Sequence, residues 1–194
     1  IALWLNDRDR RGQGWNWLGR WSGRLAALAS LITLIVGVSY GAGASGASDT
    51  YGSVSQATLW AKGTLRVNEP LAAIDPIVAP GAPPLGYTLV PPDTLVPIYS
   101  PGLPIMMALA SVGGERMMYL VVPILGALTV WLTYRLGCIV SGPRTGLVAA
   151  VLLSWSPVFL EQLFLPIADL PAGAWLLGAI VLALAVFSRS SFLA

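Results

Sequence analysis

The chain of 194 residues is 56% hydrophobic and only 10% charged, with a formal net charge of +2 and a mean hydropathy of +0.73. Soluble domains carry about 25% charged residues, so this composition predicts an integral membrane protein and gives no sign of a nucleic-acid partner. The chain holds no histidine and one cysteine, Cys138. A histidine-based triad, an internal disulfide and a Cys/His zinc site within this chain are therefore excluded.

The first segment, residues 1–24, combines five arginines with three closely spaced tryptophans, Trp15, Trp17 and Trp21. We expect a basic and aromatic N-terminal segment on the cytoplasmic side. Two interpretations of its structure stay open. It is an interfacial segment with its rings at the headgroup level and its arginines near the phosphates, or a flexible basic tail.

The first predicted span is residues 25–43, which contain no charge and approach the roughly 20 residues that a helix needs to cross a bilayer. Residues 44–116 are predicted to form a long external loop. At its start, residues 48–65 mix apolar and polar side chains and are too polar to span, so we expect a short helix along the membrane surface.

The middle of this loop, residues 70–104, is dense in proline, which excludes a regular helix because proline removes donors and clashes with the preceding turn. The stretch is still rich in leucine, isoleucine and valine, so we expect an ordered loop packed against other surface structure. Residues 103–114 are apolar but too short to span, and predict a half-buried or re-entrant helix.

Three further spans are predicted at residues 117–140, 145–163 and 170–187, with a tight turn at 141–144. Pro157 is expected to kink or end the third span. The predicted fold class is therefore all-α, a polytopic transmembrane bundle of about four spans. We expect residues 25–194 to form the N-terminal part of a larger membrane domain.

The distribution of charge predicts the orientation of the bundle. With a cytoplasmic N-terminus, the inner segments hold eight arginines and two acids, and the outer segments hold three basic residues and seven acids. This asymmetry follows the positive-inside rule. The outer basic residues are Lys62, Arg66 and Arg116, and the outer acids are Asp49, Glu69, Asp75, Asp93, Glu115, Glu161 and Asp169.

Two of the outer acids follow or precede a span directly. Asp49 comes after the first span and Asp169 comes before the fourth, so an up-and-down bundle puts both at one membrane level. Each is surrounded by small or apolar residues, which favours partial burial and a role as proton acceptor. Other interpretations stay open: Asp49 is a solvated acid, and Asp169, with Pro171 close behind it, is a helix N-cap.

Three motifs occur in order along the chain: "SDTYGSVSQATLWAKGTL" from residue 48, "YSPGLPIMMAL" from residue 99 and "ADLPAGAWLL" from residue 168. Their order and topology resemble the GT-C membrane glycosyltransferases, in the branch similar to protein mannosyltransferases and lipid A aminoarabinose transferases. One departure is Ala168, since the family commonly has serine before the second acid. The resemblance implies that the chain is a fragment of a longer enzyme and is inactive alone.

The resemblance also implies an activity. Such enzymes move a sugar from a polyprenyl-phosphate carrier to a lipid, glycan or protein acceptor on the outer face, with inversion, here in a bacterial inner membrane. Asp49 would act as general base and Asp169 would bind acceptor, phosphate or a divalent cation, to which both acids are candidate ligands. The candidate phosphate- and substrate-binding residues are Lys62, Arg66, Arg116, Tyr51 and Tyr99.

Two other functions stay open. A transporter or flippase subunit would use intramembrane carboxylates, but every outer acid lies at a helix end or in a loop of the predicted topology. A non-catalytic scaffold would bind a partner through the proline-rich loop and would tolerate replacement of Asp49 and Asp169. For each outer basic residue, an ordinary lipid-headgroup contact is the simpler alternative.

Overall fold

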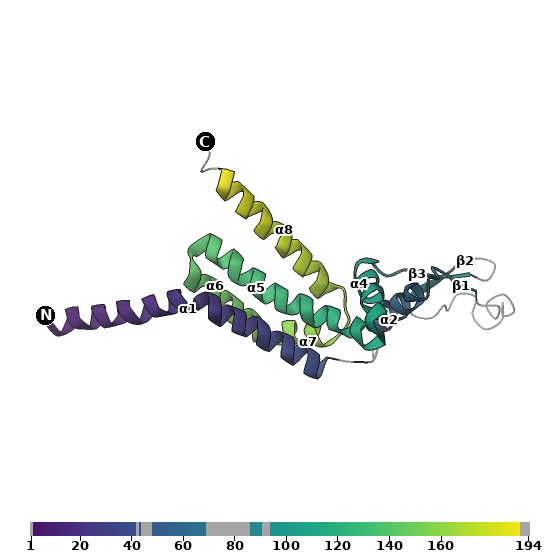
Figure 1. The fold of residues 1–194 in the computed structure, drawn as a ribbon, viewed down its shortest axis with the longest axis horizontal. Coiled ribbons are helices and arrows are strands. Elements are labelled where there is room, and N and C mark those ends of the chain that lie inside the picture. Colours follow the sequence, from purple (N-terminus) through teal and green to yellow (C-terminus); the bar gives the residue numbers. More distant parts are fainter. Residues whose placement is uncertain (1, 42, 44–47, 69–85, 91–93, 191–194) are drawn as a thin grey trace.

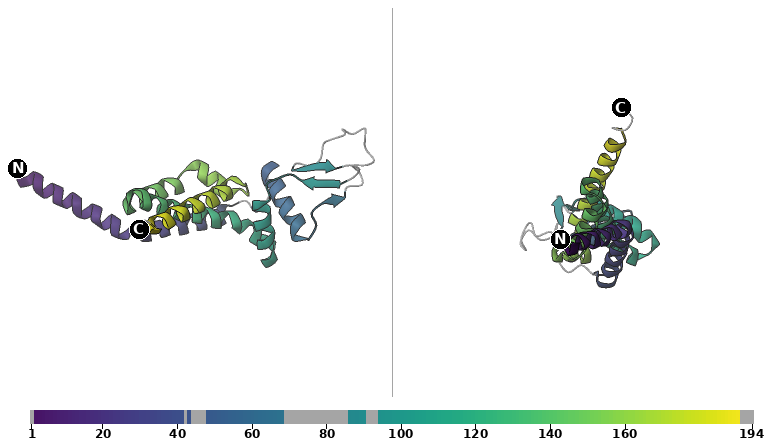
Figure 2. Two further views of the ribbon diagram at one scale, coloured as in Figure 1. Left: turned by 90° about the horizontal axis from the view of Figure 1, so that it is seen from above. Right: turned by 90° about the vertical axis from the view of Figure 1, so that its left-hand side faces the viewer.

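The computed structural model describes residues 2–41, 43, 48–68, 86–90 and 94–190, with 2–16, 48 and 188–190 described by their backbone alone. The structure is 79% helical, which confirms a predominantly helical fold. Long helices lie side by side in an elongated bundle, and a smaller part with two short helices and a sheet continues from one end (Figures 1 and 2). We call this end of the bundle the α2 end.

The elements follow one another along the chain as α1 (Ala2–Tyr40), α2 (Ser48–Ala61), β1 (Val67–Asn68), β2 (Tyr87–Val90), β3 (Thr94–Pro97), α4 (Gly102–Ala110), η1 (Ser111–Gly113), η2 (Glu115–Leu120), α5 (Val121–Ser141), α6 (Pro143–Ser154), α7 (Pro157–Phe164) and α8 (Asp169–Ser190). Here η marks short 3₁₀ helices. In the bundle, α5 is central and packs against α1, α6 and α8.

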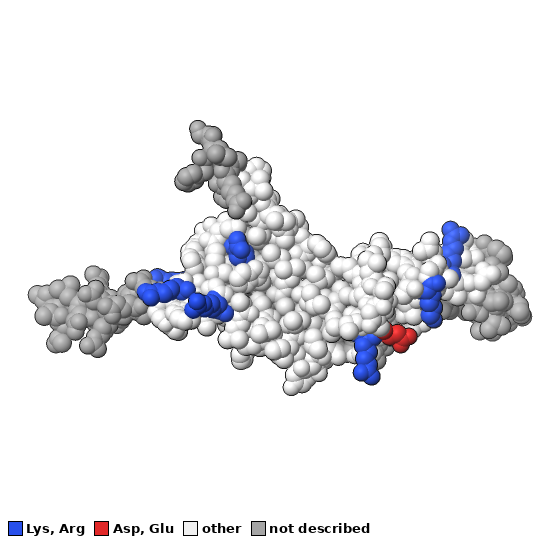
Figure 3. Space-filling model, in the orientation of Figure 1, with Lys and Arg blue, Asp and Glu red and all other residues white. Residues whose placement is uncertain are grey.

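Three stretches are long and apolar enough to cross a membrane: Trp17–Tyr40, Glu115–Ser141 and Asp169–Phe187. The pair α6 and α7 makes a fourth if it is counted as one span, with a bend of 61° between its halves. The bend follows from Pro157, which begins α7, as the sequence predicts. Figure 3 shows basic side chains toward both ends of the molecule and a broad uncharged surface between them.

The N-terminal segment, residues 2–24, is helical, which contradicts one of the two interpretations given for it above. The backbone is helical from Ala2 without interruption into the first span, so a flexible tail over residues 2–24 is wrong. The segment contains no proline, and extending an existing helix adds one hydrogen bond for each residue that is fixed.

The part beyond the bundle contains a small sheet, which the all-α prediction misses. Its three antiparallel strands lie in the order β1-β3-β2, and Leu95 pairs with Val67 on one side and Leu89 on the other. These strands lie within or beside the proline-rich stretch, whose density of proline hides the strand pattern. Most of that stretch, residues 69–85 and 91–93, lies outside the described residues.

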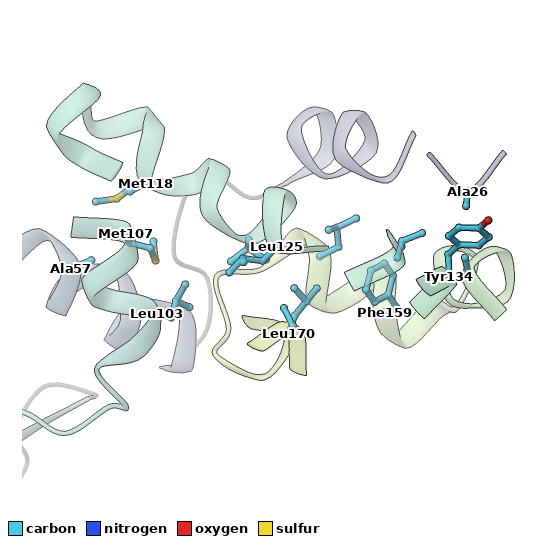
Figure 4. Packing of buried hydrophobic residues seen from close by; sticks show 14 of the residues in the cluster. Ala26, Ala57, Leu103, Met107, Met118, Leu125, Tyr134, Phe159 and Leu170 are labelled. Atoms are coloured by element: carbon cyan, nitrogen blue, oxygen red, sulfur yellow. The ribbon is translucent and has the colours of Figure 1, made fainter. Parts of the chain in front are cut away.

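The helix predicted to start the external loop is α2, and the predicted short apolar helix is α4 with η1; the position of α2 at the membrane surface stays a prediction. The two helices pack together through Ala57 on α2 and Leu103 and Met107 on α4, all buried. Figure 4 shows these side chains with Met118 at one end of the core, and Tyr134 and Ala26 at the other end, among the spans. The apolar core therefore continues from the bundle into the α2–α4 pair and connects the two parts.

Candidate functional site

One acid and one tyrosine from separate motifs meet at the start of α2. Asp49 lies in the first turn of α2, and Tyr99 lies between β3 and α4. The Tyr99 hydroxyl donates a hydrogen bond of 2.7 Å to Asp49 Oδ1 across 50 positions of sequence. A carboxylate is also favoured at this position because the N-terminus of a helix carries partial positive charge.

The ring of Tyr99 packs directly against the backbone of two glycines. A Cβ added at Gly52, on α2, would overlap the ring, and one added at Gly86 would lie 2.6 Å from ring atom Cε2 and 2.8 Å from Gly52 Cα. The Gln56 amide Nε2 also donates to the Tyr99 backbone carbonyl at 3.4 Å. The Asp49–Tyr99 pair therefore depends on small residues that let a ring and two backbone segments approach closely.

Gly52→Ala is expected to push the Tyr99 ring away from α2 and break the hydrogen bond to Asp49. Overpacking of this kind costs about 1–3 kcal/mol. The measurement is the thermal midpoint of the purified full-length protein in detergent. Gly173→Ala on α8 is the matched control, because a Cβ there meets nothing within 4 Å. Equal midpoints for the two variants would contradict the close packing of Gly52 against the ring.

A second group of predicted residues lines a pocket at the other end of α2. Lys62 and Arg116 face a cavity of about 570 Å³ that Glu115 and Tyr119 also line. The pocket lies where the chain leaves α1, at Gly43, and where η2 leads into α5. The sequence analysis counted Glu115 only as an outer acid and did not assign it to a site. Its position next to Arg116 in the sequence was the one feature that could have placed it in this pocket.

The length of α2 separates these two groups. Asp49 and Lys62 are 13 residues apart, which is about 20 Å along a helix that rises ~1.5 Å per residue. Tyr51 on α2 and Arg66 before β1 are exposed, and neither lines the pocket. Four of the predicted residues thus form two separate groups, the pair Asp49–Tyr99 and a cationic pocket with Lys62 and Arg116, and the others belong to neither.

The second acid, Asp169, is the first residue of α8. The Ala172 amide donates to the Ala168 carbonyl at 2.9 Å, so Ala168 holds the N-cap position, and the N-cap interpretation of Asp169 is wrong by one residue. Both Asp169 and Asp49 are exposed in this chain, so the expected partial burial is also wrong.

The end of α1, which precedes Asp49, and the start of α8, which begins with Asp169, both lie at the α2 end of the bundle. Gly37, near the end of α1, approaches Pro123 at the start of α5 and Leu163 at the end of α7. Leu170, beside Asp169, packs near Gly126 of α5. Figure 1 shows α8 beginning at this same end.

The described residues show no ready-made cluster of metal ligands. Mg²⁺ and Ca²⁺ sites need several oxygen ligands, and no group of three or more Asp, Glu, Cys or His side chains comes together within the described part of the chain. The predicted cation on Asp49 and Asp169 stays a prediction, and the reaction proposed for this site does not depend on it.

Compared with known proteins, the chain matches no family model, no curated protein and no solved structure. Its functional interpretation therefore rests on its own residues and on the order of its three motifs.

Proposed function

We propose that the chain is part of a membrane glycosyltransferase that moves a sugar from a polyprenyl-phosphate carrier to a lipid, glycan or protein acceptor. The proposal places the reaction on the extracytoplasmic face of a bacterial inner membrane, with the N-terminus in the cytoplasm. The observation that supports it best is the hydrogen bond between Tyr99 and Asp49. These residues come from two separate motifs of the resemblance, and they meet beyond the α2 end of the bundle.

In this proposal Asp49 takes the proton of an acceptor hydroxyl. The acceptor oxygen attacks the anomeric carbon from the face opposite the phosphate, the bond from that carbon to the phosphate oxygen breaks, and polyprenyl phosphate leaves with the electron pair. A carboxylate accepts several hydrogen bonds at once. Tyr99 can therefore orient Asp49 through Oδ1 while the acceptor hydroxyl binds the same group.

The cationic pocket has a separate role in this proposal. The breaking bond joins the sugar directly to the phosphate, so the reacting phosphate must lie close to the base. Lys62 lies about one α2 length, ~20 Å, from Asp49, and Arg116 lines the same pocket as Lys62. We assign both to the carrier phosphate before and after transfer. Their pocket lies where α1 ends and η2 leads into α5, which is the depth expected for a lipid headgroup.

A transporter is supported by one observation in the described chain, the 61° bend between α6 and α7. Broken helices in transporters present polar groups or charges to a substrate at the break. The break here falls at Ser154, Trp155 and Ser156, with no ionisable side chain, and Pro157 accounts for it. The bend alone therefore favours a transporter less than the Asp49–Tyr99 pair favours a transferase.

The test is an activity measurement on the full-length protein in membranes. Radiolabelled polyprenyl-phosphate sugars are supplied, and transfer of label to acceptors is followed for the wild type and for the double variant Asp49→Asn/Asp169→Asn. We expect transfer by the wild type and none above background by the double variant. Glu161→Gln is the matched control, since it removes an exposed acid of α7 and should leave transfer unchanged.

Two results would overturn the proposal. One is wild-type transfer by the double variant at equal protein level. The other is an absence of transfer from every polyprenyl-phosphate sugar by the folded wild-type protein.

A further inference from the structure

Gln56, on α2, has the largest fully buried polar side chain among the described residues, with 2% of its surface exposed. Its amide Nε2 donates a hydrogen bond of 3.4 Å to the Tyr99 backbone carbonyl. Its amide oxygen, Oε1, is buried and has no hydrogen-bond partner in the described part of the chain. The donor half of this buried amide is therefore used, and the acceptor half is not.

Gln56 belongs to a row of α2 residues that contacts Tyr99 at three points. Asp49, Gly52 and Gln56 are spaced three and four residues apart, so they share one face of the helix. The Tyr99 hydroxyl donates to Asp49, and the Tyr99 ring packs against Gly52. The Tyr99 carbonyl accepts from Gln56. The tyrosine is thus attached to α2 at both ends, so the position of its backbone decides whether its hydroxyl reaches the carboxylate.

Stability does not account for an amide at this position. A buried acceptor without a partner costs more free energy than a typical intramolecular hydrogen bond contributes, and the bond to Tyr99 is long and only partly buried. The indole Nε1 of Trp60, one turn further along α2, is also buried without a partner among the described residues. Two unsatisfied atoms thus lie on the helix that carries Asp49, and departures from local rules of this kind are typical of functional sites.

We propose that Gln56 is a positioning residue of the proposed sugar transfer. Its amide fixes the Tyr99 backbone, so that the Tyr99 hydroxyl holds the Asp49 carboxylate toward the acceptor. This inference rests on the proposed function. Gln56 acts only through Tyr99 and contacts neither the sugar nor the phosphate, so its contribution is to the rate of the chemical step rather than to donor binding or to the stability of the fold.

The first measurement is the rate of Tyr99 nitration in the purified full-length protein, which does not depend on sugar transfer. Gln56→Met keeps a similar side-chain volume and removes the amide donor, so Tyr99 should separate from α2 more often. We expect Tyr99 nitration to rise roughly 2- to 10-fold, the usual effect of losing one hydrogen bond. Tyr51, an exposed tyrosine of α2, is the internal reference and should react as before. The thermal midpoint should be no lower than that of the wild type.

The second measurement is a double-mutant cycle on sugar transfer. Gln56→Met should lower kcat roughly 2- to 10-fold and leave the KM for the polyprenyl-phosphate sugar unchanged. In protein that already carries Tyr99→Phe, and so lacks the hydroxyl, the same substitution should have little further effect. Ser55→Ala is the matched control, because the Ser55 hydroxyl donates to the Gly52 carbonyl within α2. It should leave kcat and Tyr99 nitration unchanged.

Three results would overturn the inference. They are unchanged Tyr99 nitration in Gln56→Met, equal slowing of transfer with and without the Tyr99 hydroxyl, and a lowered thermal midpoint, which would show that the amide serves the fold. Increased Tyr99 nitration in a protein whose wild type transfers no sugar would overturn the proposed function instead, and would support the attachment of Tyr99 to α2 through Gln56.

Discussion

Asp49→Asn is expected to slow sugar transfer by roughly 10²–10⁴-fold, the usual contribution of a general base. Asparagine has nearly the same shape as aspartate, and its side-chain oxygen still accepts the hydrogen bond that the Tyr99 hydroxyl donates to Asp49 at 2.7 Å. The change therefore removes the proton acceptor and leaves the packing of α2 intact. The measurement is the initial rate of label transfer by full-length protein in membranes, at matched protein levels.

Companion variants determine how the loss arises. Tyr99→Phe keeps the ring between the two glycines and removes only the hydroxyl, so it should slow transfer less than Asp49→Asn does. Asp49→Glu keeps a carboxylate but moves it, and should recover part of the rate. A wild-type rate for Asp49→Asn would show that another group takes the proton, and Glu115 in the cationic pocket would become the first acid to replace.

Gly146→Val is expected to separate α5 from α6 and to destabilise the bundle more than Gly52→Ala does. A Cβ at Gly146 would overlap the Tyr134 backbone carbonyl and lie 3.0 Å from the Cys138 amide nitrogen, and one at Gly137 would lie 2.5 Å from Gly146 Cα. These neighbours are backbone atoms and cannot rotate away. Small residues allow such close approach between membrane helices, and the cost should reach or exceed the upper end of the ~1–3 kcal/mol range for overpacking.

The measurement for Gly146→Val is the fraction of full-length protein that stays monodisperse in detergent after heating. Gly173→Val is the matched control, because a Cβ at Gly173 of α8 meets nothing within 4 Å. Both variants place a β-branched residue in a helix, so their intrinsic helix propensity costs are the same. A midpoint for Gly146→Val equal to that of Gly173→Val would show that α5 and α6 do not pack through these glycines.

Much of the bundle could be predicted because the membrane fixes the length of its helices. A span needs about 20 apolar residues, and the stretches Glu115–Ser141 and Asp169–Phe187 lie within three residues of the predicted spans 117–140 and 170–187. The stretch Trp17–Tyr40 overlaps the predicted span 25–43 but begins eight residues earlier and ends three residues earlier. Local chemistry predicted two further features: the break before Pro157, and the turn at Gly142, whose φ of 93° favours glycine.

The small sheet could not be predicted in the same way. Its central strand, β3, gains its partners from β1 and β2, and β1 is far away in sequence. No local pattern encodes such a pairing. Prolines within and around the strands also argue against a strand in the sequence, because proline has no amide hydrogen to donate to a neighbouring strand. Tertiary contacts therefore decided the conformation of a segment that local rules assigned to a loop.

The sequence predicted which residues belong to the candidate site better than it predicted how they are arranged. The motif order indicated Asp49 and Tyr99, yet their contact depends on Gly52 and Gly86, and no local rule links these glycines to the ring between them. The separation of Asp49 from Lys62, in contrast, follows from helix rise alone once residues 48–61 are taken as one helix. Burial was predicted wrongly because small neighbours around an acid do not cover it unless another element packs above them.

The unbroken length of α1 has one more mechanical consequence. Its 39 residues measure about 58 Å at ~1.5 Å per residue, nearly twice the ~30 Å thickness of the hydrocarbon layer. Even a strongly inclined rod of this length projects into water. At the C-terminal end of α1, the Tyr40 ring lies 6.3 Å, centre to centre, from the ring of Phe164, the last residue of α7. A rotation of the N-terminal part of α1 would therefore be transmitted along the helix to the end of α7.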